Sequence, residues 1–162
     1  MAIIYCDMDG VLADFKTAAV RTTGMSINKW MNIPSSKEKW SLIKQNKNFW
    51  STLPWMPGGK QLWSYISKFD PHILSAYVEE SFDPNCIPGK TAWLRKNTGL
   101  SNRSKINLVR RKDKKLFAKR GKPSILIDDY EKNVRDFINA GGQAIHHTNT
   151  SKTISQLKRL GF

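Results

Sequence analysis

Two short apolar runs, each ending in paired carboxylates, constrain what this chain can fold into. The first is Ile3-Ile4-Tyr5-Cys6, and Asp7-Met8-Asp9-Gly10 follows it directly. The second is "PSILIDD", residues 123–129, which closes with Asp128 and Asp129. Runs that are apolar throughout are typical of strands buried on both faces of a sheet. Paired carboxylates at the end of such a strand repel each other and lose hydration, so they need positive charge nearby.

Other segments of the chain alternate between strand-like and helix-like patterns. Strands are predicted at 2–6, 71–78 (ending near Ser75), 105–109, 123–129 and 143–147. Helices are predicted at 11–22, 89–99, 130–142 and 151–160, with a basic turn or short helix at 112–120. This alternation predicts an α/β fold, a Rossmann-like parallel sheet with helices on both faces.

Residues 25–69 have a different composition, with five of the six tryptophans of the chain. Pro34-Ser35-Ser36 indicates a helix start capped by Ser35 or Ser36. Pro57-Gly58-Gly59 indicates a turn into another helix. The block is therefore predicted to form two or three short amphipathic helices.

The chain is strongly basic, with a formal net charge of +14. The positive charge is concentrated between residues 90 and 122, where Asp113 is the one acid. Such a segment attracts phosphate-bearing partners, nucleic acid included, but it is also compatible with a merely solubilising surface. The sequence leaves both interpretations open.

Membrane and secreted classes are not indicated. No apolar stretch approaches the roughly 20 residues that cross a bilayer, and the start of the chain lacks the pattern of a signal peptide. Cys6 and Cys86 are the only cysteines and are expected to be reduced thiols. We expect a cytoplasmic protein.

The carboxyl ends of parallel strands meet at one edge of a sheet, where ligands bind. Asp7, Asp9, Asp128 and Asp129 are therefore expected to lie together, and carboxylates so grouped need a cation. A hard divalent ion with oxygen ligands, such as Mg²⁺, fits best. A hydroxyl and a lysine would complete a phosphate site, and Ser75 and Lys114 are available.

In order and spacing, these residues resemble the four motifs of the haloacid dehalogenase-like phosphohydrolases. The closest resemblance is to the 5'(3')-deoxyribonucleotidase branch, through "DMDGVLADF" (7–15), "LIDD" (126–129) and the segment 49–63. The resemblance implies a core made of 1–15 and 70–162. It also implies a small helical cap, 16–69, inserted after the first strand, which excludes water during the reaction.

The resemblance also implies roles for single residues. Asp7 would be the nucleophile that forms an aspartyl-phosphate, and Asp9 the acid and base. Magnesium would be held by Asp7, the Asp9 carbonyl and Asp129, with Asp128 acting through water or as an outer partner. Ser75 and Lys114 would bind the phosphoryl oxygens, and Lys115 is the alternative lysine. Phe49 and Trp50 are placed either for stacking on a base or for plain packing.

The expected activity is magnesium-dependent hydrolysis of (deoxy)ribonucleoside monophosphates. One alternative is a phosphatase acting on nucleic-acid ends or on another small phosphorylated substrate. A second is a nucleic-acid-binding module without turnover, against which the intact pair of Asp7 and Asp9 argues. For Asp129, a plain helix N-cap is the competing structural role. The sequence indicates no oligomeric state.

Overall fold

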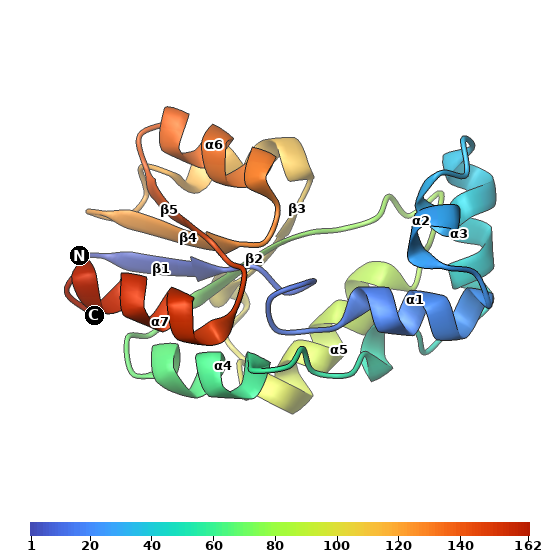
Figure 1. Cartoon of the computed structure of the whole chain (residues 1–162), viewed down its shortest axis with the longest axis horizontal. Helices are drawn as coiled ribbons and strands as arrows, with labels where there is room; N and C mark the ends of the chain where they lie inside the picture. The colour runs from blue at the N-terminus through green and yellow to red at the C-terminus, as the bar shows by residue number, and fades with distance from the viewer. The chain divides into compact units, whose positions relative to one another are not determined.

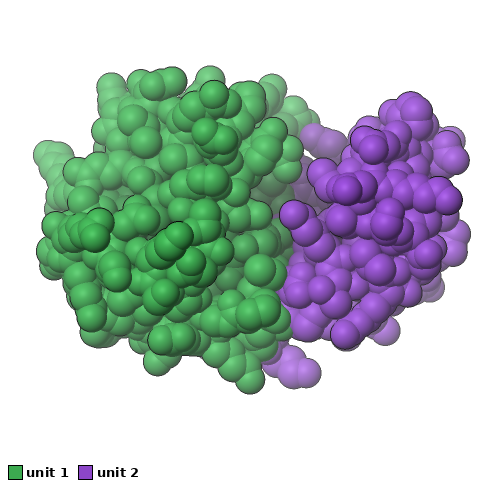
Figure 2. Space-filling view, in the orientation of Figure 1, with its two compact units in different colours: residues 1–13, 55–76, 102–162 green, residues 14–54, 77–101 purple.

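The computed structural model describes the whole chain, residues 1–162. The chain divides into two compact units, shown in different colours in Figure 2. Unit 1 comprises residues 1–13, 55–76 and 102–162, and unit 2 comprises residues 14–54 and 77–101. None of the helices has the length and apolar character needed to cross a membrane.

Unit 1 is built on a five-stranded sheet in the order β3-β2-β1-β4-β5, with all neighbouring strands parallel. The strands are β1 (Ile3–Cys6), β2 (His72–Ala76), β3 (Ile106–Val109), β4 (Ser124–Asp128) and β5 (Gln143–His146). The central strands β1 and β4 are apolar and almost wholly buried, as expected for strands covered on both faces. The predicted Rossmann-like α/β class is confirmed.

Helices cover both faces of this sheet (Figure 1). On one face lie α6 (Glu131–Asn139) and the 3₁₀ helix η3 (Arg111–Phe117), which contact each other. On the other face lie α4 (Gly59–Ser67) and α7 (Thr150–Arg159), also in mutual contact. The short 3₁₀ helix η2 (Arg103–Lys105) precedes β3.

The core under α6 and η3 holds η3 in place against the sheet. Tyr5 of β1 packs edge-to-face on Phe117 of η3 at 5.5 Å between ring centroids and on Phe137 of α6 at 6.4 Å. All three rings are buried. Because η3 turns every three residues, anchoring Phe117 also orients Lys114 toward the sheet.

Unit 2 is helical and has an aromatic core. Its elements are α1 (Phe15–Thr23), α2 (Ile27–Met31), α3 (Ser36–Lys44), the 3₁₀ helix η1 (Trp50–Thr52) and α5 (Cys86–Thr98). Phe15 lies at its centre and packs on the rings of Trp30, Trp40, Phe49 and Trp50. The buried Trp50 donates from Nε1 to Asp83 Oδ2 at 2.7 Å.

Some predicted helix ends match the structure and others differ: α5 begins at Cys86 instead of residue 89, and α6 ends at Asn139 instead of residue 142. Ser35 caps α3, and Gly99 ends α5 in the left-handed conformation. The first helix begins at Phe15 instead of residue 11, because residues 8–13 form a tight turn in which Leu12 N and Ala13 N both donate to Met8 O. Asp14 then caps α1 by accepting from Thr17 N at 3.1 Å.

The compact units do not follow the expected boundaries of 1–15 with 70–162 and of 16–69. Residues 55–69, which include α4, belong to unit 1, and 77–101, which include α5, belong to unit 2. The apolar side of α4 is buried within unit 1, where Leu12 O accepts from Met56 N at 2.7 Å. In unit 2, Trp93 of α5 donates to Leu53 O at 2.7 Å. That pairing joins segments 40 residues apart, which a composition change along the chain does not reveal.

Candidate active site

The ends of β1 and β4 place Asp7 and Asp128 side by side. Cys6 pairs with Ile127 in the sheet, and Asp7 N donates to Ile127 O at 2.9 Å. The chain runs from β1 outward to β2 on one side and to β4 on the other. These carboxylates therefore lie where the strand order reverses, the usual ligand position in open α/β sheets.

A third carboxylate completes the group. One oxygen each of Asp7, Asp128 and Asp129 lies within 4.8 Å of the others. Asp7 and Asp128 are buried, and Asp129 is partly exposed. The predicted convergence of sequence-distant carboxylates is thus present for these three side chains.

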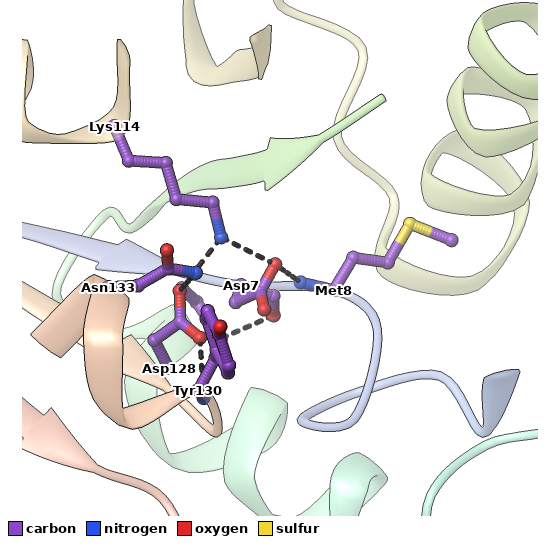
Figure 3. A network of polar contacts seen from close by, with 7 residues as sticks. Asp7, Met8, Lys114, Asp128, Tyr130 and Asn133 are labelled. Atoms are coloured by element: carbon purple, nitrogen blue, oxygen red, sulfur yellow. Dashed lines mark hydrogen bonds and ion pairs between the residues drawn. The ribbon is translucent and has the colours of Figure 1, made fainter. Parts of the chain in front are cut away.

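Lys114 is the cation inside this group (Figure 3). Its Nζ lies 2.7 Å from Asp128 Oδ2 and 3.2 Å from Asp7 Oδ1, and the residue is buried. Lys115 is exposed. Of the two candidate lysines, the structure therefore brings Lys114 to the carboxylates.

Asp128 is held through both of its oxygens. Tyr130 N donates to Oδ1 at 2.9 Å, and Asn133 Nδ2 donates to Oδ2 at 3.1 Å. Sequence reasoning missed Asn133, which lies in the first turns of α6. Asn133 is buried beside Val134 on the inward side of that helix, and the sequence alone carries no signal that it contacts Asp128.

Burial and like charges perturb the acids of the site. Burial, with the negative charge of Asp7 adding to it and Lys114 opposing it, raises the pKa of Asp128 to about 6. Burial, followed by the charges of Asp7 and Asp128, raises the pKa of Asp129 to about 7. Burial disfavours the charged form of Lys114, but Asp7 and Asp128 outweigh it and raise the pKa of the ammonium group.

The donor set suits a hard divalent cation. Three carboxylates lie together, and one ammonium group pairs with two of them, so the group keeps surplus negative charge when its members ionise. Carboxylate oxygens are the ligands that Mg²⁺ uses in proteins. The residues therefore fit the predicted metal.

Gly10 lets the loop after β1 approach Asp129 closely. Its φ of 81° is a conformation that favours glycine. A Cβ atom at Gly10 would lie 2.1 Å from Asp129 Oδ2. The glycine of the first motif thus leaves space for a carboxylate of the last one.

Asp9 and Ser75, the remaining candidates of unit 1, lie after β1 and in β2. Asp9 is partly exposed in the loop after β1, and its side chain is not one of the three grouped carboxylates. Ser75 is buried in β2, beside Leu108 of β3. The alternative role of Asp129 as a helix cap is wrong, because Tyr130 occupies the N-cap of α6 and no side chain caps that helix.

Phe49 and Trp50 belong to the core of unit 2. Each is 1% exposed, and their ring centroids lie 5.1 Å apart in an edge-to-face contact. Neither ring presents an open face on which a base could stack. Of the two interpretations of these residues, the structure supports packing and corrects their assignment to a base pocket.

Comparison with solved structures finds haloacid dehalogenase-like hydrolases. A hydrolase from Streptococcus pneumoniae is 11% identical at a TM-score of 0.57, with 96% of this chain and 97% of that chain covered. L-2-haloacid dehalogenase from Xanthobacter autotrophicus is 12% identical at a TM-score of 0.57, with 99% and 83% covered. CbbY from Rhodobacter sphaeroides, in complex with phosphate, is 14% identical at a TM-score of 0.52, with 88% and 84% covered.

The chain therefore has the haloacid dehalogenase-like fold. No family model matches the sequence, and no curated protein sequence is a significant match. At these identities the likeness concerns the fold.

Proposed function

We propose that this protein is a magnesium-dependent phosphomonoesterase of the haloacid dehalogenase-like superfamily, acting on nucleotide phosphates. One observation carries the proposal. On this fold, Asp7 and Asp128 contact the buried Lys114 at the carboxyl edge of the sheet, and Asp129 lies beside these two carboxylates. Such a group suits the binding and transfer of a phosphoryl group, where positioning and charge neutralisation supply most of the catalysis.

Asp7 is the nucleophile. Its Oδ1 accepts from Met8 N at 2.8 Å and lies 3.2 Å from Lys114 Nζ, so the carboxylate is fixed in orientation (Figure 3). With Oδ1 engaged, Oδ2 attacks phosphorus in line, and the bond between phosphorus and the leaving alkoxide breaks. The aspartyl-phosphate is then hydrolysed by water, which divides one difficult step into two easier ones.

Asp9 handles the proton in both steps. It lies two residues after Asp7, at the start of the loop that follows β1. In the first step it protonates the leaving alkoxide, and in the second it takes a proton from the attacking water. Lys114 and Ser75 bind the phosphoryl oxygens.

Asp7, Asp129 and the Asp9 carbonyl would hold Mg²⁺, and Asp128 would support these ligands from outside. When bound, the ion neutralises phosphoryl charge and relieves the repulsion between the carboxylates. The supporting observations are the surplus of carboxylates over cations and the space that Gly10 leaves around Asp129.

The substrate class rests on other grounds. The first motif resembles that of the deoxyribonucleotidases, and the net charge of +14 favours encounter with anionic substrates. The CbbY structure was solved with phosphate. We therefore assign (deoxy)ribonucleoside monophosphates as the substrate class to be tested first.

The test is release of inorganic phosphate with Mg²⁺ from a panel of dNMPs, NMPs, sugar phosphates and a 3'-phosphorylated oligonucleotide. Asp7→Asn is expected to lose activity by about three orders of magnitude or more, as for removal of other catalytic nucleophiles. Asp136→Asn, the same change on the outer side of α6 where Asp136 pairs with Lys132, is the matched control. If no member of the panel is hydrolysed and nucleic acid binds with a steep salt dependence, the protein is a binding module instead.

A further inference from the structure

We infer that the rim of this site binds a nucleic-acid strand, so that the preferred substrate is a terminal phosphate on an oligonucleotide. The inference rests on the proposed function and refines its substrate class. The rim is formed by Arg111 and Lys112 at the start of η3 and by Tyr130 at the start of α6. All three residues are exposed.

Arg111 and Tyr130 form a stacked pair. The guanidinium carbon of Arg111 lies 4.8 Å from the centre of the Tyr130 ring, and the tyrosine residue is 44% exposed. An exposed aromatic ring beside an arginine is the usual element on which single-stranded bases stack. Unlike the rings of Phe49 and Trp50, this ring is open to a ligand.

The pair lies directly beside the phosphate chemistry. Tyr130 follows Asp129 in sequence, and its backbone N donates to Asp128 Oδ1 at 2.9 Å. Arg111 lies three residues before Lys114, which is one turn of the 3₁₀ helix η3. When a terminal phosphate of the substrate lies near Lys114, the nucleotides attached to it are therefore within reach of Arg111 and Tyr130.

The charge of the rim exceeds what a mononucleotide can use. In the proposed function, Lys114 and Ser75 bind the single phosphate of a nucleoside monophosphate. Arg111 and Lys112 are two further exposed cations next to that site. Additional phosphodiester groups, which only a strand carries, give these cations anionic partners.

The first experiment compares kcat/KM for a 3'- or 5'-phosphorylated 12-nucleotide oligothymidine with kcat/KM for the matching thymidine monophosphate. The wild type is expected to prefer the strand. Arg111→Ala and Tyr130→Leu are expected to lower this preference by about fivefold or more, the effect of losing one stacked base. An unchanged preference in both variants, with folding verified by thermal melting, would overturn the inference.

The second experiment measures binding of a fluorescein-labelled, phosphate-free 12-nucleotide oligothymidine by anisotropy, in EDTA, from low to high KCl. Arg111→Gln/Lys112→Gln is expected to reduce the slope of log K against log[salt] by about 1.4, or about 0.7 for each phosphate that the protein no longer neutralises. Lys60→Gln/Lys152→Gln removes the same charge from the exposed surface of α4 and α7, on the other face of the sheet. An equal reduction in this control would mean diffuse attraction and no strand site.

The two experiments separate the strand site from the chemistry. Release of phosphate from the mononucleotide without measurable strand binding would contradict this inference alone. If neither substrate loses phosphate, the proposed function fails, and the strand substrate fails with it.

Discussion

At the scale of single residues, the site depends on one ammonium group shared by carboxylates. Lys114 contacts Asp7 and Asp128 and is buried with them. Removing one partner of a buried ion pair leaves charge without compensation, which costs far more than an exposed pair contributes. Lys114 thus supports both the fold near the site and the binding of phosphate.

We predict that Lys114→Gln lowers the unfolding free energy by about 3 kcal/mol or more at neutral pH and greatly reduces phosphate release. Lys115→Gln is the matched control, since Lys115 is exposed on the same helix. Urea unfolding monitored by fluorescence, with parallel assays of turnover, checks both variants. Equal effects of the two changes would show that Lys114 is not the lysine of the site.

The raised pKa values of Asp128 and Asp129 give a pH dependence in the absence of metal. In the folded protein these groups have pKa values of about 6 and about 7, above their unfolded value of 3.8. Between about pH 4 and 7 the folded state therefore binds more protons than the unfolded state, and stability falls as pH rises. We predict this decline in EDTA, and a larger stabilisation by Mg²⁺ at about pH 7.5 than at about pH 5.

Thermal melting across this pH range, with and without Mg²⁺, is the measurement. Asp129→Asn removes one of the two titrating groups and should flatten the decline. This separates the contribution of the site from that of other groups, such as His147, whose pKa is lowered by burial. The account is contradicted if the wild type and Asp129→Asn show the same pH dependence in EDTA.

At the scale of elements, strand ends were more predictable than the surroundings of the side chains. Apolar runs followed by carboxylates located β1 and β4, because a strand that is buried on both faces is apolar at successive positions. Asn133 and the amide of Tyr130 could not be predicted as partners of Asp128, because their approach depends on how α6 lies on the sheet. The tryptophan-rich block was predicted as helical, but an aromatic residue has the same sequence signature whether it packs or binds a base.

We predict that Trp50 stabilises unit 2. Trp50→Phe removes the donor to the buried Asp83 Oδ2 and should lower the unfolding free energy by about 1–3 kcal/mol. Trp40→Phe changes an indole of the same aromatic cluster and is the control for loss of ring area. If Trp50→Phe unfolds like the wild type but raises KM for nucleotides selectively, Trp50 contacts the base after all.

At the scale of the whole molecule, the fold places chemistry from distant parts of the sequence at one edge of one sheet. Asp7 and Asp128 are more than a hundred residues apart along the chain, yet their strands are neighbours. The units were harder to predict than the sheet, because their limits depend on contacts such as Trp93 to Leu53 and not on composition. That a cap formed by residues 16–69 closes over the site during the reaction stays a prediction.

The central claim is that Asp7 carries the phosphoryl group. It is tested most directly by mixing the wild type with Mg²⁺ and a substrate that it hydrolyses, quenching in acid, and reducing with borohydride, which converts an aspartyl-phosphate to homoserine. Peptide mass spectrometry is predicted to find homoserine at position 7 in the wild type and at no other aspartate, and none in Asp7→Asn. Homoserine at another aspartate, or full turnover by Asp7→Asn, would contradict the account.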